Sequence, residues 1–148
     1  MSVLGKYNAP VLDRIAWYGG NSAVGYAGSG MYFRGKVFSS AGFEGMAYAG
    51  GVCGPRKCGE KRGNSWGLKD MIGNVWEWCF DWYGAYEVKG GGPVVDPRGA
   101  VQGVRRVDRG GCWSNDAVLC RSANRNGNDP AYRFSNLGFR PALVPSVD

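Results

Sequence analysis

The chain has 148 residues, the size of one average domain, and its residues are 44% hydrophobic but only 20% charged. Its 26 glycines accompany 6 Trp, 8 Tyr and 6 Phe, which argues against a disordered or collagen-like chain and favours a loop-rich globular domain with an aromatic core. The net charge of +6 is scattered rather than concentrated in a run, so we expect no dedicated nucleic-acid site.

The N-terminal part of the sequence is dominated by glycine. It contains one helix candidate, residues 10–18, followed by glycine-rich segments at 18–30 and 48–54. Glycine in such clusters supplies the backbone conformations of tight turns. We therefore predict irregular structure over most of the first 65 residues.

Residues 74–83, NVWEWCFDWY, give the clearest strand signal, because aromatic residues recur with a period of two. One face of this strand would carry only aromatic rings, and we expect it to be buried. The other face carries Glu77 and Asp81, for which Arg109 and Arg140 are the expected bidentate partners. The predicted aromatic face consists of Trp76, Trp78, Phe80 and Trp82.

After a predicted connecting loop at 83–100, two further short strands are expected, at 104–113 and 137–144.

Five cysteines and no histidine exclude the zinc and nucleophilic sites that need an imidazole. Cys53 and Cys58 enclose a short polar loop. Cys112 and Cys120 flank a predicted turn or strand pair, and Cys79 has no counterpart. These spacings do not match a four-cysteine zinc ribbon. Two disulfides in an oxidising compartment and five free thiols in a reducing one both remain open.

Three strings occur in a specific order: GLKDMIGNVWEWCFDWYG at 67–84, RVDRGGCW at 106–113 and NLGFRPAL at 136–143. Together they resemble the core of the formylglycine-generating enzyme, or sulfatase-modifying factor, family. The resemblance covers most of residues 16–144. It implies a single domain over 1–148 with an α+β, C-type lectin-like fold, in which short sheets are joined by much irregular structure.

The resemblance does not include the family's catalytic features. The chain is shorter than the enzymes and lacks a segment similar to RLPTEAEWE. Active members carry a cysteine pair after RGG, one thiolate of which binds copper, whereas residues 114–119 contain no cysteine. Cys120 matches a structural cysteine of the family, and Cys112 stands where serine is usual. We expect no catalytic residue and no enzyme; a copper-dependent oxidase is the remote alternative.

Between these motifs, residues 114–136 alternate small polar or aromatic groups with apparently fixed elements. This layout resembles the variable region of target proteins of diversity-generating retroelements, where mutation of adenines rewrites asparagine codons. Such a codon, changed at its first two bases, never specifies Lys, Glu, Gln, Met or Trp. The resemblance implies a scaffold in 1–112 and a variable region in 113–140. Its ligand-contacting residues would be Ser114, Asn115, Asp116, Val118, Leu119, Gly127, Asn128, Asp129, Ala131, Tyr132, Phe134, Ser135 and Asn136.

The side chains at these thirteen positions suit recognition better than catalysis. Ser, Asn, Asp, Tyr and Phe give adaptable hydrogen bonds and rigid contact area, as in antibody loops, whereas catalytic groups need a fixed supporting shell. We therefore predict a non-catalytic protein that binds a protein or a surface glycan through a hypervariable surface. The alternative is a non-diversified accessory or carbohydrate-binding domain, whose asparagines serve turns.

No cofactor is predicted. Some family members hold calcium near the GNVWEW turn, where Asn74 and Glu77 would contribute here. Calcium takes about six to eight oxygen ligands. Few are visible in this stretch, so a structural role for both residues is preferred.

The sequence shows neither a membrane span nor a secretory signal. No segment approaches the roughly 18 apolar residues of a spanning helix, and residues 1–14 lack a basic start and an apolar run. We expect a soluble chain, and its location remains open among virion, cell surface and cytoplasm.

Overall fold

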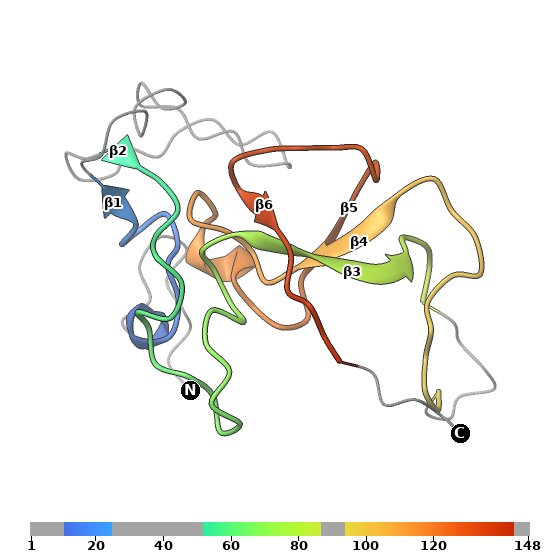
Figure 1. The fold of residues 1–148 in the computed structure, drawn as a ribbon, viewed down its shortest axis with the longest axis horizontal. Coiled ribbons are helices and arrows are strands. Elements are labelled where there is room, and N and C mark those ends of the chain that lie inside the picture. Colours follow the sequence, from blue (N-terminus) through green and yellow to red (C-terminus); the bar gives the residue numbers. More distant parts are fainter. Residues whose placement is uncertain (1–10, 25–51, 87–93, 144–148) are drawn as a thin grey trace.

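A computed structural model describes residues 11–24, 52–86 and 94–143 (Figure 1). The glycine turns predicted within 25–30 and 48–51 therefore lie outside the described residues, as do residues 87–93 of the predicted loop.

Within residues 11–24 and 52–65 there is little regular structure, as the glycine content indicates. The helix predicted over 10–18 is wrong among the described residues: only η1, a 3₁₀-helix at Leu12–Arg14, forms there. The carboxylate of Asp13 accepts hydrogen bonds from Tyr18 and Asn21, which hold the following turn instead of a longer helix. Strands β1 and β2, antiparallel to each other, span Ala23–Val24 and Val52–Cys53.

The main sheet has four strands in the order β5-β4-β3-β6 (Figure 1). Strand β4 is antiparallel to both β3 and β5, whereas β6 is parallel to β3, so the sheet is mixed. A second 3₁₀-helix, η2, spans Ala117–Leu119 between β4 and β5. The strands are β3 (Trp76–Trp82), β4 (Arg106–Arg109), β5 (Arg125–Asn128) and β6 (Leu137–Gly138).

The strand predicted from the aromatic alternation is confirmed as β3, but the burial of its aromatic face is not. Trp76 is buried, whereas Phe80 on the same predicted face is 91% exposed. Two features explain the difference. The pairing with β4 shifts register between Trp78 and Trp82, which interrupts the alternation. Strand β6 pairs only with Trp76 and Glu77, so the second half of β3 runs past it.

A glycine pair turns the chain directly after β4. Gly110 and Gly111 have φ angles of 95° and 76°, which L side chains rarely adopt. A Cβ at Gly111 would lie 2.9 Å from the sulfur of Cys120. The RGG string therefore brings the backbone close to the core and leads it into Cys112 and Trp113.

Two clusters of buried side chains form the core. One combines residues around η1 with residues around η2, and the other lies where β3 begins. The first cluster joins residues 12–18 to residues 117–120, and the second joins the start of β3 to residues 112–113. Segments that are far apart in the sequence therefore pack together as one scaffold. The first contains Leu12, Ala16, Tyr18, Ala117 and Cys120, and the second contains Trp76, Cys112 and Trp113.

Strands β5 and β6 lie at opposite edges of the main sheet, so residues 129–136 must cross from one edge to the other. This crossover appears as the long connection between β5 and β6 in Figure 1. In the described part of the chain, no helix is both long and apolar enough to cross a membrane.

Candidate ligand-binding surface

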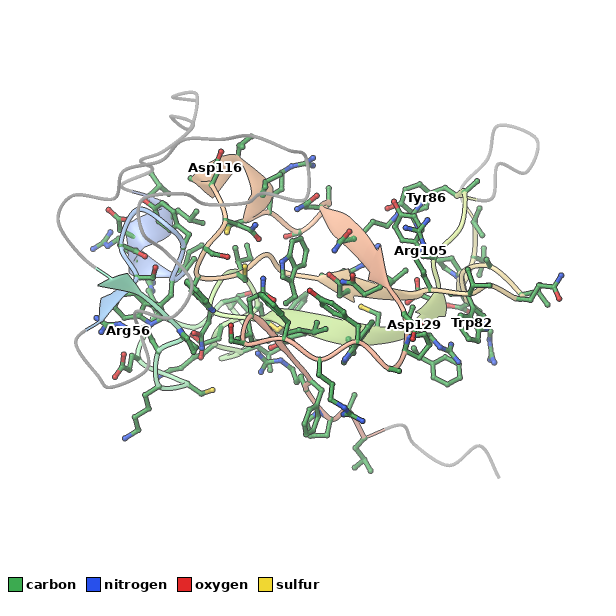
Figure 2. All side chains as sticks on the ribbon, turned by 90° about the horizontal axis from the view of Figure 1, so that it is seen from above. Arg56, Trp82, Tyr86, Arg105, Asp116 and Asp129 are labelled. Atoms are coloured by element: carbon green, nitrogen blue, oxygen red, sulfur yellow. The ribbon has the colours of Figure 1, made fainter. Side chains whose placement is uncertain are left out.

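The structure divides the thirteen predicted contact residues into two groups. One group surrounds η2 and the other runs from the end of β5 along the crossover. Figure 2 shows Asp116 beside η2 and Asp129 beside Trp82, at the opposite end of the molecule. The fold therefore does not bring the thirteen positions together into one continuous surface.

The first residues of the η2 group belong to the scaffold. Ser114 and Asn115 are each only 7% exposed. The Asn115 side chain accepts a hydrogen bond of 2.9 Å from the backbone N–H of Cys112, and its carbonyl accepts one from Gly19. Only Val118, which is 46% exposed, and the half-buried Asp116 and Leu119 present side-chain surface.

Gly127 is also buried, in the middle of β5. A Cβ at this position would lie 2.5 Å from Cγ of Tyr83 and 2.8 Å from its Cβ. Those atoms belong to the stem of the side chain and cannot rotate away without moving the tyrosine. In this conformation, Gly127 cannot present a variable side chain to a ligand.

The crossover, in contrast, presents a row of exposed side chains. We define the crossover surface as Asp129, Ala131, Tyr132, Phe134 and Ser135, which are all exposed. The rings of Tyr132 and Phe134 stack with centroids 5.9 Å apart, and each residue is 42% exposed. Aromatic rings held in this way supply contact area at a small entropic cost.

Main-chain bonds shape the crossover and fix its two ends. Near the start, the N–H of Tyr132 donates to the carbonyl of Asp129 over 2.8 Å. At the end, the N–H of Trp76 donates to the carbonyl of Asn136 over 2.8 Å, and the indole N–H of Trp113 donates to the carbonyl of Ser135 over 3.4 Å. These contacts use backbone atoms of the crossover, so they survive a change of its exposed side chains.

The predicted contact residue Asn128 has a structural partner that sequence reasoning missed. Its side-chain amide donates a 2.9 Å hydrogen bond to Oδ2 of Asp108, a fully buried residue of β4. The other oxygen, Oδ1, has no hydrogen-bond partner. Burial raises the pKa of the Asp108 carboxyl, and the amides of Asn128 and Asn126 offset this only in part.

A cluster of arginines and aromatic rings lies beyond the thirteen positions, at the ends of β3 and β4. Arg106 pairs with Trp82 on one side and with Asn128 on the other, so the three residues form one row across the sheet. The sequence signal was the run VRRVDR next to an aromatic strand. Without the register of the two strands, that signal does not show which arginine meets which ring.

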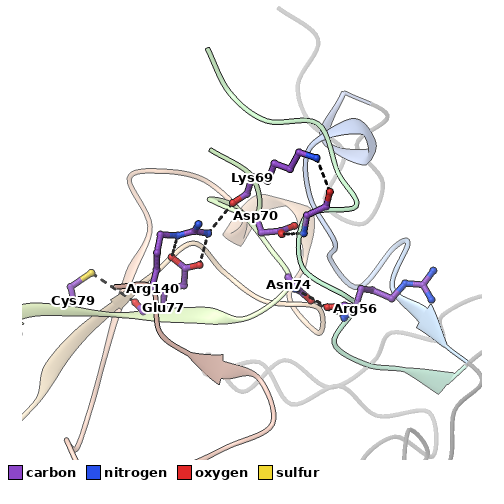
Figure 3. A network of polar contacts seen from close by, with 8 residues as sticks. Arg56, Lys69, Asp70, Asn74, Glu77, Cys79 and Arg140 are labelled. Carbon is purple, nitrogen blue, oxygen red and sulfur yellow. Dashed lines mark hydrogen bonds and ion pairs between the residues drawn. The ribbon is translucent and has the colours of Figure 1, made fainter. Parts of the chain in front are cut away.

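The expected partner of Glu77 is confirmed. Nε and Nη2 of Arg140 donate to the two carboxylate oxygens of Glu77 over 2.9 and 2.7 Å (Figure 3). This hydrogen-bonded pair raises the pKa of Arg140. The other predicted partner, Arg109, donates instead to the carbonyl of Ser122 over 3.2 Å.

Asn74, the second residue considered for calcium, also contacts protein groups. Its Oδ1 accepts from the N–H of Arg56 over 2.8 Å, and its Nδ2 donates to the carbonyl of Arg56 over 3.1 Å (Figure 3). No cluster of three or more Cys, Asp or Glu side chains suited to a metal occurs in the described ranges. The hydrogen bonds of Asn74 to Arg56 and of Glu77 to Arg140 tie this stretch to the neighbouring chain.

The cysteines that the structure describes are free thiols: Cys58, Cys79, Cys112 and Cys120. The side chain of Cys53 lies outside the described residues. Cys112 and Cys120 are buried, and desolvation raises the pKa of both thiols. A thiol with a raised pKa forms little thiolate, which is the reactive and metal-binding form.

Comparison with known proteins gives three informative matches. "Serine/threonine-protein kinase pkn1" of Chlamydia pneumoniae is 38% identical over 150 residues, covering 86% of this chain but 23% of the kinase. The formylglycine-generating enzyme of Streptomyces coelicolor is 44% identical over 85 residues, covering 55% of this chain and 26% of the enzyme. The chain thus spans about a quarter of the length of these relatives.

The third match is a solved structure, Treponema denticola variable protein 1. It superimposes with a TM-score of 0.60 at 31% identity, covering 88% of this chain and 36% of the Treponema protein. The model of the sulfatase-modifying factor enzyme 1-like domain matches residues 24–144. These findings confirm the resemblance carried by the three sequence strings, and the chain belongs to the sulfatase-modifying factor enzyme 1-like domain family.

Proposed function

We propose that this domain is a non-catalytic ligand-binding protein, and that the crossover surface is its main contact region. The observation that carries the proposal is the different use of backbone and side chains in residues 129–136. Backbone atoms hold its ends and the Asp129 carboxylate accepts the N–H of Ala131 over 2.8 Å, while the side chains of Ala131, Tyr132, Phe134 and Ser135 are exposed. Recognition surfaces combine a rigid frame with exposed aromatic and small polar groups in this way.

We further propose that the scaffold has the C-type lectin-like form expected from the family resemblance. The mixed sheet, the short strands and the low helix content are compatible with it. The likeness to a structure named variable protein 1 supports the idea that the exposed positions vary. The ligand would be a protein or a surface glycan.

Burial refines the proposed contact set. Ser114, Asn115 and Gly127 are left out because they are buried and have little or no room to change. Asn128 and Asn136 are half-buried, and each side chain hydrogen-bonds to a buried residue of the scaffold. Asp116, Val118 and Leu119 would form a separate, smaller patch beside η2.

The source genome provides the direct test of variability. The proposal expects a near-copy of the region coding for residues 113–140, beside a reverse transcriptase gene, that differs only where the copy has adenine. Sister copies should then differ at Ala131, Tyr132, Phe134 and Ser135 and retain Gly127. A genome with no such repeat would favour the alternative, a non-diversified accessory or carbohydrate-binding domain.

An oxidase is the second candidate, because relatives named formylglycine-generating enzyme match more than half of this chain. The buried thiols of Cys112 and Cys120, with raised pKa values, argue against it. The test is Cu(I) titration followed by incubation with a cysteine-containing peptide. Stoichiometric copper binding and conversion of that cysteine would replace the binding proposal with the enzyme.

A further inference from the structure

The side chains of three arginines contact aromatic rings at the end of the sheet that carries Trp82. Arg105 precedes β4, Arg106 begins it, and Arg125 begins the neighbouring β5. Figure 2 shows Arg105, Trp82 and Tyr86 at this end of the molecule, far from Arg56. We define the arginine edge as Arg105, Arg106 and Arg125 with the rings they contact: Phe80, Trp82, Tyr83 and Tyr86.

Stacking on aromatic rings fixes the three guanidinium groups. The Cζ atom of Arg106 lies 3.5 Å from the ring centroid of Trp82 and 5.4 Å from that of Phe80. Its Nη1 also donates to the carbonyl of Phe80. This arginine is therefore held in place before any ligand arrives, which lowers the entropic cost of binding.

The other two arginines share one tyrosine. The Cζ atoms of Arg105 and Arg125 lie 5.2 and 4.8 Å from the ring centroid of Tyr83. Arg125 also lies 3.9 Å from the ring centroid of Tyr86 and donates to the carbonyl of Gly84 over 2.6 Å. Arg105 is thus held by one ring and Arg125 by two rings and a backbone oxygen, none of which neutralises the guanidinium charge.

Within the described residues, no carboxylate lies within ion-pair distance of these three guanidinium groups. Asp81 lines a cavity of about 260 Å³ together with Arg109 and Arg125, yet the Arg125 guanidinium contacts two rings and a carbonyl instead of this carboxylate. A guanidinium offers up to five N–H donors, and one or none is used at each of these arginines in the described contacts. The arginine edge is therefore a fixed positive surface with unused donors.

We propose that the arginine edge is a second binding site, which takes an acidic segment of a protein partner. Because neighbouring strand residues point to opposite faces, one carboxylate of the partner would pair with Arg106 beside Trp82 and another with Arg105 beside Tyr83. Its apolar side chains would pack on the exposed rings of Phe80 and Tyr86, which are 91% and 63% exposed. The net charge of +6 adds long-range attraction for such a segment.

The composition of the edge favours a protein over other anions. Tyr, Trp and Arg are the residues that dominate binding energy at protein interfaces, and lysine is depleted there. The arginine edge consists of these residue types and Phe, with no lysine. A nucleic-acid groove, in contrast, uses many Lys and Arg contacts along a phosphate backbone.

Fluorescence anisotropy with a labelled peptide of alternating Glu and Phe tests the site. Its matched probe has Gln in place of every Glu. The intact chain should bind the Glu peptide at least about tenfold more tightly, and this preference should weaken with added salt. The double variant Arg105→Gln/Arg106→Gln should lose the preference, while Arg106→Lys should keep part of it because the charge remains without the bidentate fork.

The control removes two arginines elsewhere, in Arg14→Gln/Arg62→Gln, since both side chains are exposed near η1. It should bind like the intact chain, and thermal unfolding checks that all variants fold. Equal losses in both double variants, or no preference for Glu over Gln, would overturn the proposal. So would tighter, edge-dependent binding of a thymidine oligonucleotide or a polyuronate. Because the edge lies outside the thirteen positions, none of these outcomes decides whether the crossover varies.

Discussion

The thirteen predicted contact residues fall into two halves, within 114–119 and 127–136, that have similar residue types but different structural roles. In the first half, Ser114 and Asn115 are almost fully buried, and Asn115 bonds to the backbone of the scaffold. In the second half, the side chains from Asp129 to Ser135 are exposed on a segment held by backbone hydrogen bonds and by one bond from the Ala131 N–H to the Asp129 carboxylate. Small polar residues can thus either stabilise a turn or contact a ligand, and the burial of the side chain distinguishes the two roles.

The largest effect should come from a side chain at Gly127. Gly127→Val should lower the free energy of unfolding by about 3 kcal/mol, because the new Cβ would collide with the stem of Tyr83. Denaturant unfolding measures the loss. The double variant Tyr83→Ala/Gly127→Val should recover part of it relative to Tyr83→Ala alone. If the Gly127→Val single variant were as stable as the parent, Gly127 would again count among the positions that can vary.

A smaller loss of stability is expected from a change at Asn115, in the first half. Asn115→Ala removes the acceptor of the Cys112 N–H and leaves that buried donor unpaired, which should cost about 2 kcal/mol. Thermal unfolding of Ser135→Ala, an exposed position of the crossover, provides the matched reference and should change stability by less than about 0.5 kcal/mol. Equal effects at the two sites would remove the distinction between the halves.

The buried carboxyl of Asp108 predicts a pH-dependent difference. Its pKa is raised in the folded state, so folding binds a proton that the unfolded chain releases near pH 4. The stability due to this group is present below that pH and is lost as the pH rises through the folded-state pKa. Asp108→Asn should therefore be more stable than the parent at pH 7, by about 1 kcal/mol, with the difference closing below about pH 4.

Unfolding across pH 3–8 measures this difference, with Asp96→Asn at an exposed site as the control. Asp96→Asn should show no comparable trend. A destabilised Asp108→Asn at neutral pH would mean that the carboxylate is held by an interaction absent from the described contacts.

The smallest effect on stability should come from the exposed rings. Tyr132→Ser/Phe134→Ser removes the stack of two rings that are each 42% exposed and leaves both buried core clusters intact, so it should lower stability by less than about 1 kcal/mol. Calorimetric unfolding checks this value. A loss as large as that of Gly127→Val would show that the crossover rings belong to the core.

The sequence allowed the parts of the fold that depend on local pattern to be predicted. The alternation of aromatic residues marks β3, and the charge on Glu77 requires a partner that Arg140 supplies. The family strings identify the turn at Gly110 and Gly111, where the backbone needs glycine. These features follow from a few neighbouring residues and from the rule that half-buried charges are paired.

Other features depend on pairings between distant residues. The exposure of Phe80 follows from a register shift and from the short β6, neither of which is visible in the alternation. The contact between Asn128 and Asp108, and the stacking of Arg106 on Trp82, likewise require the register of three strands. The alternation of residue types that predicted the contact set therefore could not indicate which of its members are buried.

Two display libraries test the central claim most directly, with each randomised position limited to residue types reachable from a mutated asparagine codon. One library changes Ala131, Tyr132, Phe134 and Ser135; the other changes Ser114, Asn115 and Gly127. The account predicts that most members of the first library remain folded and that sorting on unrelated target proteins yields specific binders, while most members of the second unfold. Equal folding in both libraries, or binders only from the second, would contradict it.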